Sequence, residues 1–97
     1  MGKQITKERM DKYFDITGRA IDLVKKSPIS QEYRKEALDF LDMAERYFSD
    51  ALHFYNQGEW VTAFAALNYS HGWLDAGARI GIFKVKDNNL FTVDGEQ

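Results

Sequence analysis

Hydrophobic residues recur every three or four positions along three stretches of the chain, a spacing that places them on one side of an α-helix. This pattern predicts helices over about residues 6–26, 31–57 and 59–80, followed by a tail over residues 82–97. The second stretch is the most regular, with a hydrophobic side that includes Phe40, Leu41, Ala44, Phe48, Ala51 and Leu52. The fold class predicted from this pattern is all-α.

The ends of the predicted helices coincide with residues that start or stop helices. Thr6 and Ser30 can each cap an N-terminus, because a side-chain hydroxyl accepts a hydrogen bond from a free backbone N–H. Pro28 disfavours a helical conformation in the residue before it, and Gly58 and Gly81 can adopt the left-handed conformation that often follows a helix. The connections are therefore short, which predicts an up-down-up three-helix bundle formed by a single helical domain over residues 1–97.

Charge is distributed unequally between the first two helices. Residues 1–27 contain seven Lys or Arg and four Asp or Glu, whereas residues 28–59 contain three and seven. A basic helix beside an acidic one is favourable, although each exposed ion pair contributes only about 0–1 kcal/mol. Burial of the hydrophobic sides must therefore provide most of the stability.

The third predicted helix is hydrophobic around most of its circumference. Only a narrow strip is polar, formed by Asn68, Asp75 and Arg79 with Gly72 beside them. Such a helix is buried on more than one side. We therefore expect the stretch from Trp60 to Ile80 to be enclosed almost completely, with the tail or a second chain covering what the other two helices leave open.

The tail has a different pattern. Ile82–Val85 and Leu90–Val93 are short runs of β-prone residues around the turn signal Asp87-Asn88-Asn89. An isolated hairpin is only marginally stable in water. We expect this β-prone or irregular tail to pack on the bundle or to be partly disordered.

Composition excludes several classes of protein. The chain has 97 residues, no Cys and a formal net charge of −2. The absence of Cys excludes disulfides and thiolate metal sites, and the slightly acidic balance makes nucleic-acid binding improbable. There is no hydrophobic run long enough to span a membrane, and the first residues do not resemble a signal peptide. We expect a cytoplasmic protein with no membrane association.

The strip on the third helix contains the best candidate for a binding site. His71 and Asp75 are four residues apart, as are Asp75 and Arg79, so their side chains can meet on one side of the helix. A His held by a carboxylate can act as a base or a metal ligand, but a half-buried His with a structural role is the stronger expectation. Gly72 lies in the strip, where another backbone or a ligand could approach closely, whereas Gly77 lies on a small-residue side that favours close helix packing.

Two further patterns on the second helix have weaker support. Arg46 and His53 are seven residues apart and resemble the Arg-x(4–6)-His signature of helical RNA-cleaving domains of the HEPN type. The acidic side of this helix ends in Asp50-x-x-His53, but its carboxylates should point into solvent, so no metal site is predicted. No nucleophile–His pairing or phosphate-binding Gly loop is present, and we predict neither catalytic residues nor a cofactor.

The run from Thr62 to Phe83 contains Tyr69-Ser70-His71-Gly72-Trp73-Leu74-Asp75-Ala76-Gly77, which resembles the signature of a small archaeal family known as domain of unknown function 357. The resemblance covers the second and third helices and extends loosely into the tail. It implies a compact α-helical domain from an archaeal cytoplasm, and it implies no activity. The positions that match the signature are His71, Gly72, Trp73, Asp75, Gly77 and Arg79.

These observations favour a non-enzymatic protein-interaction or self-association module. It would present Asn68, His71, Gly72, Trp73, Asp75 and Arg79 to a protein partner or to a second copy of the chain. The first alternative is a site for a nucleotide or another anion, with Arg79 as the charge partner, Asn68 and His71 as hydrogen-bonding groups and Trp73 or Tyr69 as a stacking surface. The second alternative is RNA cleavage by Arg46 and His53.

Overall fold

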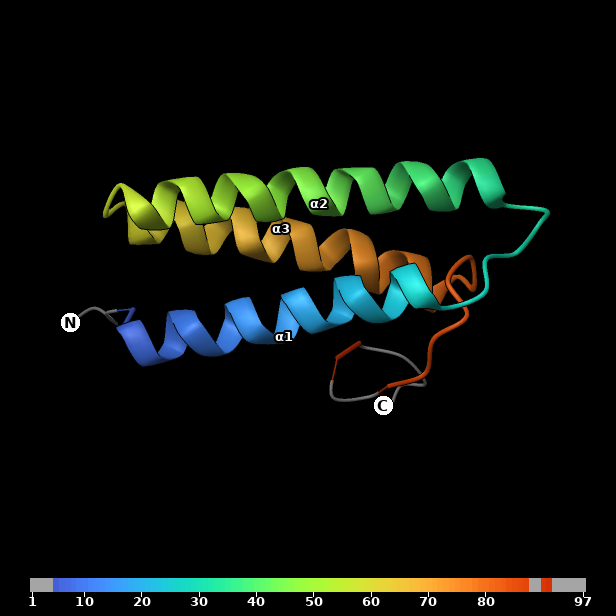
Figure 1. Cartoon of the computed structure of the whole chain (residues 1–97), viewed down its shortest axis with the longest axis horizontal. Helices are drawn as coiled ribbons and strands as arrows, with labels where there is room; N and C mark the ends of the chain where they lie inside the picture. The colour runs from blue at the N-terminus through green and yellow to red at the C-terminus, as the bar shows by residue number, and fades with distance from the viewer. Residues whose placement is uncertain (1–4, 88–89, 92–97) are drawn as a thin grey trace.

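The computed structural model describes residues 5–87 and 90–91. Within them the chain forms three helices, α1 (Lys7–Lys26), α2 (Arg34–Asn56) and α3 (Trp60–Arg79). α1 and α3 run in the same direction and α2 runs opposite to both (Figure 1). The all-α, up-down-up bundle predicted from the sequence is confirmed.

Most of the predicted helix ends are confirmed. The Thr6 side chain accepts a hydrogen bond from the Arg9 N–H at 3.1 Å and caps α1, and the chain becomes extended at Ser27, the residue before the proline. Gly58 and Gly81 have positive φ angles of 80° and 87°, so each follows a helix in the conformation that glycine adopts with least strain.

The start of α2 differs from the prediction. Ser30 does not cap the helix, which begins three residues later than expected, at Arg34. The backbone around Ile29 pairs with Phe83 of the tail in an isolated β-bridge. A turn then follows, in which the Tyr33 N–H donates to the Ser30 carbonyl at 3.2 Å. The tail contact thus holds this connection extended, and the helix can form only after the turn.

α2 and α3 pack closely because small residues meet along their contact. Ala37, Ala44 and Ala51 repeat every seven residues on α2 and are completely buried. Ala63 and Ser70 are separated by the same interval on α3 and are buried as well. The Ser70 hydroxyl donates to the Ala44 carbonyl at 2.6 Å, which satisfies a buried polar group at the middle of this contact.

Gly77 serves a different neighbour from the one predicted. We expected it to allow a close approach of two helices, but a methyl group at this position would overlap the ring of Phe83 in the tail. Phe83 is 2% exposed, and its backbone N–H donates to the Gly77 carbonyl at 3.1 Å. Gly77 therefore allows the tail to dock on α3.

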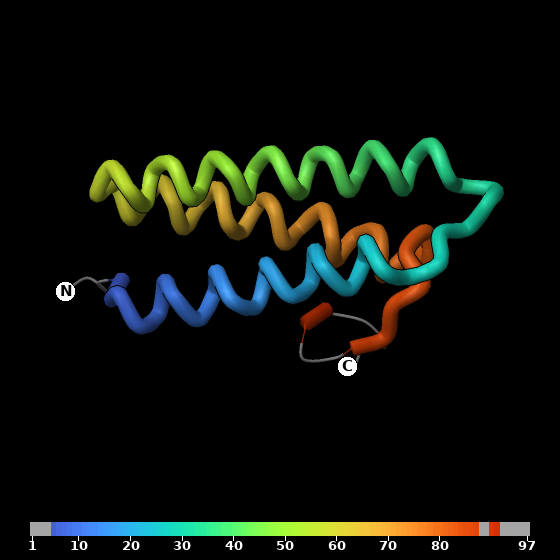
Figure 2. Tube along the Cα trace, viewed as in Figure 1, coloured from blue at the N-terminus to red at the C-terminus, as the bar shows by residue number. Residues whose placement is uncertain are grey.

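The tail crosses the bundle beside α1 and α3 (Figure 2). Ile82, Phe83, Val85, Leu90 and Phe91 are buried, so the expectation that the tail packs on the bundle is confirmed for the described residues. Phe83 of the first β-prone run pairs with Ile29 in the isolated β-bridge, and Leu90 and Phe91 begin the second run. Thr92 and Val93 of that run lie outside the described residues.

α3 is not enclosed to the extent expected. α1, α2 and the tail cover its two flanks, but a third side is open to solvent, and Val61, Tyr69 and Ile80 are 76%, 64% and 65% exposed. The reason is geometric, because two neighbouring helices cannot surround a third and the tail crosses only near His71 and Gly77. In the described part of the chain, no helix combines the length and hydropathy required to cross a lipid bilayer.

Candidate functional site

His71 joins three parts of the fold. Its Nδ1 lies 3.0 Å from the Thr17 hydroxyl of α1, and its Nε2 lies 2.6 Å from the Leu90 carbonyl of the tail. Asp75 Oδ1 lies 3.7 Å from Nε2, one helical turn further along α3. The His71 ring therefore connects α3 to both α1 and the tail.

These contacts define the hydrogen-bonding roles of the ring. A carbonyl oxygen can only accept, so Nε2 carries a proton and donates to Leu90. In the neutral ring Nδ1 then accepts from the Thr17 hydroxyl, whose side chain is itself buried. Both nitrogens are occupied by the fold, so the structure supports the structural role for His71 that the sequence favoured over a base or metal ligand.

A hollow between α1 and α3 lies next to this cluster. Asn68, His71, Gly72 and Asp75 line it from α3, together with Tyr13, Ile16 and Thr17 of α1 and Leu67. Four of the six predicted site residues thus do meet around one hollow. Both ring nitrogens of His71 are nevertheless already bonded to Thr17 and Leu90 of the protein itself.

Trp73 points to the other side of α3. It packs edge-on against Phe40 of α2, with ring centroids 5.0 Å apart. Together with Asn68, Gly72 and three further α3 residues, these two rings line a second, shallow hollow between α2 and α3. The predicted strip is therefore divided between two hollows: Asn68 and Gly72 line both, His71 and Asp75 line only the α1–α3 hollow, and Trp73 lines only the α2–α3 hollow. Arg79 lies one turn beyond Asp75, exposed at the end of the helix.

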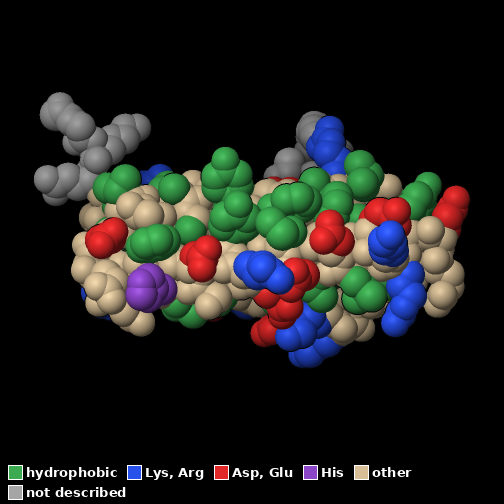
Figure 3. All heavy atoms as spheres, turned by 90° about the horizontal axis from the view of Figure 1, so that it is seen from above, with side chains coloured by type: hydrophobic (Ala, Val, Ile, Leu, Met, Phe, Trp, Pro, Cys, Tyr) green, Lys and Arg blue, Asp and Glu red, His purple; other side chains and the backbone are tan. Residues whose placement is uncertain are grey.

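The exposed side of α3 carries fewer charged residues than the exposed sides of the other helices, since seven of the twelve exposed residues of α2 are charged. All ten exposed residues of α1 are charged. Of the eight exposed residues of α3 only Arg79 is charged, and we call this set the outer face of α3: Val61, Thr62, Ala65, Asn68, Tyr69, Gly72, Ala76 and Arg79. Figure 3, which looks onto α2, shows hydrophobic side chains gathered in a band along the length of the bundle beside an area of charged groups.

Gly72, at the centre of the outer face, is not explained by the fold. A methyl group placed on it would meet no atom within 4 Å, and its backbone is helical. Glycine in a helix interior costs about 1 kcal/mol relative to alanine. The isolated chain thus bears this cost without any packing benefit at this position.

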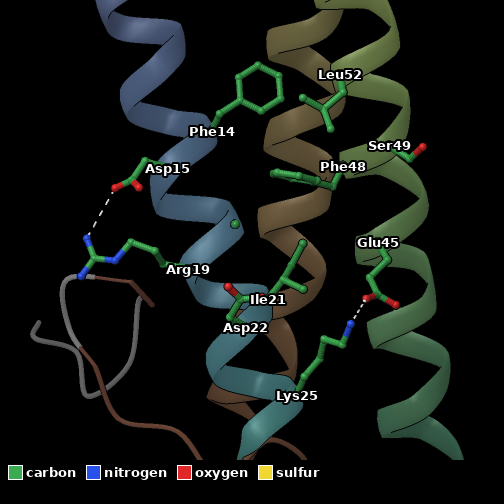
Figure 4. A pocket seen from close by; sticks show the side chains of 11 residues that line it. Phe14, Asp15, Arg19, Ile21, Asp22, Lys25, Glu45, Phe48, Ser49 and Leu52 are labelled. Atoms are coloured by element: carbon green, nitrogen blue, oxygen red, sulfur yellow. Dashed lines mark ion pairs between the residues drawn. The ribbon is translucent and has the colours of Figure 1, made fainter.

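A third hollow lies between α1 and α2 and has a charged rim. Figure 4 shows Phe14, Phe48 and Leu52 projecting between the two helices, while Lys25 and Glu45 form an ion pair of 3.0 Å that bridges them. This pair is the contact expected between a basic first helix and an acidic second one. Because the rim consists of charged side chains, this groove resembles an ordinary solvated surface more than the outer face of α3 does.

The two residues of the HEPN-like pattern are both exposed on α2. Seven residues of helix separate them by about 10 Å along the axis. Arg46 is already paired with Asp42 at 2.9 Å, and the His53 ring contacts Phe54. Within the residues that the structure describes, no three His, Asp or Glu side chains are grouped as they would be around a metal ion.

Sequence reasoning missed the partners of the candidate residues. Thr17 interrupts the hydrophobic side of the first helix, and a buried hydroxyl there required a polar partner, so this position contained a usable signal. Phe40, which the spacing places on the hydrophobic side of the second helix, also lines the α2–α3 hollow. Leu90 contributes only a backbone carbonyl, for which the sequence carries no signal.

Comparisons with known proteins place the chain in a family. No curated protein and no solved structure matches it significantly. Residues 12–83, which include α2, α3 and most of α1, match the family model described as protein of unknown function (DUF357). Because this match covers well over half of the 97 residues, the chain belongs to the DUF357 family.

Proposed function

We propose that this protein is an interaction module whose docking surface is the outer face of α3. The observation that supports the proposal most strongly is the chemical contrast between α1 and α3, since every exposed residue of α1 is charged but only one of the eight exposed residues of α3, Arg79, is charged. Protein interfaces are depleted of charge at their centres and enriched in aromatic residues, as this face is with Tyr69 and the neighbouring Trp73.

Gly72 provides a second reason for this proposal. A glycine in the middle of an exposed helical side lowers stability without serving the fold, but it lets another backbone approach closely. Ala65 and Ala76, one to two turns away on the same face, add little bulk. The centre of the face is therefore low and uncharged, with larger apolar groups beside it.

The small-ligand alternative has less support. The hydrogen-bonding capacity of His71 is directed at Thr17 and Leu90, and Trp73 faces the opposite hollow from His71. An anion site built from Asn68, His71, Trp73 and Arg79 would require these groups to converge. Their division between two hollows favours a broad contact surface over a pocket for a small molecule.

The test is affinity isolation of partners with a matched pair of variants. Gly72→Glu places a charge at the centre of the outer face, at an exposed position where an added Cβ meets no neighbouring group. Ser49→Glu places the same charge on an exposed position of α2 beside the α1–α2 groove. We expect partners recovered with the wild type to be retained by Ser49→Glu and lost with Gly72→Glu. Equal recovery with both variants would refute the proposal.

A further inference from the structure

We propose that the partner docking on the outer face of α3 is a second copy of this chain, joined by a two-fold axis that runs parallel to α3. This inference rests on the proposed docking function and adds the identity and orientation of the occupant. It follows from the charges that border the face on its two sides. These charges differ in sign, and only one two-fold arrangement brings unlike charges together.

The α1 border of the face is basic. Arg9 lies over the Tyr13 ring with its guanidinium carbon 5.8 Å from the ring centroid, and Lys12 is one turn before Ile16. Tyr13 and Ile16 both line the α1–α3 hollow, so the two cations stand at its outer edge. Both are exposed.

The α2 border is acidic. Asp50 is exposed and lies three residues after Tyr47, whose ring stacks on Tyr69 of the outer face at 5.1 Å. Helical spacing therefore places the Asp50 carboxylate beside this pair of rings. Neither Lys12 nor Asp50 takes part in an ion pair within the described part of the chain.

The opposite charges lie at the same height along the bundle. Tyr13 contacts Phe64 with ring centroids 5.3 Å apart, so Lys12 lies level with the first turns of α3. Tyr47 pairs with Tyr69, and Tyr55 pairs with Trp60. Asp50 lies between these two pairs and is therefore level with the same part of α3.

The other end of the face repeats this polarity. Glu36 and Asp39 are exposed on α2, near the Phe40–Trp73 contact. The tail lies against α1 at this end, and its Lys84 and Lys86 are exposed. The exposed charged residues named on the α2 border are thus acidic at both ends, and those named on α1 and the tail are basic at both ends, whereas the half-buried Asp75 and Asp87 also lie on the α1 side.

Symmetry then selects one arrangement. A two-fold axis parallel to α3 keeps each residue at its own height and exchanges the borders, so Lys12 of each copy faces Asp50 of the other. A two-fold axis perpendicular to α3 within the contact plane would place α2 against α2, which brings acidic borders together. Like charges facing each other oppose association, so the first arrangement is favoured.

The available area is compatible with a dimer. A 20-residue helix is about 30 Å long, and the molecule is 28 Å wide. A face of this size approaches the roughly 800 Å² per partner that stable complexes bury. Contact by α3 alone would bury much less, so the charged borders must take part. Arg79 lies in the last turn, at the rim of the contact.

The experiment is sedimentation equilibrium of the full chain over micromolar to millimolar concentrations. We expect a reversible dimer that is weakened by added salt, because exposed ion pairs are screened. Lys12→Glu and Asp50→Lys should each weaken the dimer about tenfold or more, since either change produces two repulsive contacts in a symmetric pair. A matched change outside the face, Asp15→Lys, should leave the dimer unchanged.

Mixing the two single variants gives the decisive result. In a mixed pair the glutamate introduced by Lys12→Glu faces the lysine introduced by Asp50→Lys, and the native Asp50 faces the native Lys12. The mixture should therefore regain wild-type affinity although each variant alone is weakened. Circular dichroism of each variant verifies that it has folded.

The possible outcomes separate the two proposals. A strict monomer at millimolar concentration overturns self-association. The docking surface is still tested independently, by whether Gly72→Glu loses the partners that the wild type recovers in affinity isolation. A dimer that is insensitive to both charge changes uses another surface and overturns the inference. A mixture that does not regain affinity overturns the parallel two-fold arrangement.

Discussion

His71 stabilises the tail through hydrogen bonds that can be removed one at a time. We predict that His71→Leu lowers the free energy of unfolding by about 2 kcal/mol, because the Leu90 carbonyl and the Thr17 hydroxyl each lose a partner. Urea denaturation gives the stability, and hydrogen exchange of the Ile82, Phe83 and Leu90 amides locates the effect.

Thr17→Val is the matched control for this histidine. It removes the partner of Nδ1 but retains the bond from Nε2 to the tail. Its tail amides should stay protected, while those of His71→Leu exchange faster. If His71→Leu leaves exchange in the tail unchanged, the histidine does not hold the tail.

Asp11 links stability to pH near the start of α1. The Lys7 ammonium donates to its carboxylate at 2.8 Å, and this hydrogen bond holds the pKa of Asp11 below its ordinary value of 3.8. A lowered folded-state pKa means that the contribution is present above pH 3.8 and is lost as the pH falls through the folded-state value. Tyr55 also donates to this carboxylate, at 3.3 Å.

The predicted consequence is that a variant without the Asp11 carboxylate loses less stability as the pH falls. Asp11→Asn should lose less stability than the wild type between pH 5 and pH 3, measured by urea denaturation at each pH. Lys7→Met should reproduce the result, because it removes the cation that stabilises the ionised form. Parallel pH profiles for all three proteins would contradict this account.

The helices contain two buried or partly buried glycines, and we predict that substitution by alanine has opposite effects on stability at the two positions. A methyl group on Gly18 of α1 would lie 3.6 Å from Phe48, an ordinary contact, whereas one on Gly77 of α3 would overlap Phe83. We predict that Gly18→Ala stabilises the protein by up to about 1 kcal/mol and that Gly77→Ala destabilises it by about 1–3 kcal/mol. Urea denaturation followed by tryptophan fluorescence measures both.

A compensating change identifies the cause at Gly77. Phe83→Leu removes the ring that the new methyl group would meet. The Phe83→Leu change should therefore lower the free energy of unfolding less in the Gly77→Ala variant than in the wild type. Strictly additive effects of the two changes would show that the Phe83 ring is not what requires glycine at this position.

The helices themselves could largely be predicted from the sequence, because their signals are local. The spacing of hydrophobic residues determines where a helix forms. The residues that start or stop a helix influence the backbone only within a few positions of themselves; they are Thr6, Pro28, Gly58 and Gly81. The exception is Ser30, a good N-cap that is not used. Its backbone is held in a turn next to the Ile29–Phe83 bridge, and that bridge joins positions far apart in the chain.

The arrangement of the candidate site could be predicted only in part. The six candidate residues lie on one helix, and their spacing correctly placed His71 beside Asp75. Spacing could not show that His71 would form hydrogen bonds to α1 and the tail, whereas Trp73 would pack against α2. Nor could it show that Val61 and Tyr69 would be exposed beside Asn68, Gly72 and Arg79 of the predicted strip, because this depends on how far the two other helices and the tail surround α3.

The proposed assembly makes opposite demands on one residue, because Gly72 weakens the single chain and serves the contact between chains. Gly72→Ala adds a methyl group that meets nothing in the folded monomer but stands at the centre of the outer face. The two effects can be separated by concentration, since unfolding is measured on dilute monomer and association on concentrated protein.

The most direct measurement is therefore paired urea denaturation and sedimentation equilibrium on Gly72→Ala and the wild type. The account predicts that the variant is more stable as a monomer, by up to about 1 kcal/mol, and self-associates at least tenfold more weakly. A variant that gains stability and still associates as well as the wild type would contradict a docking role for the outer face of α3.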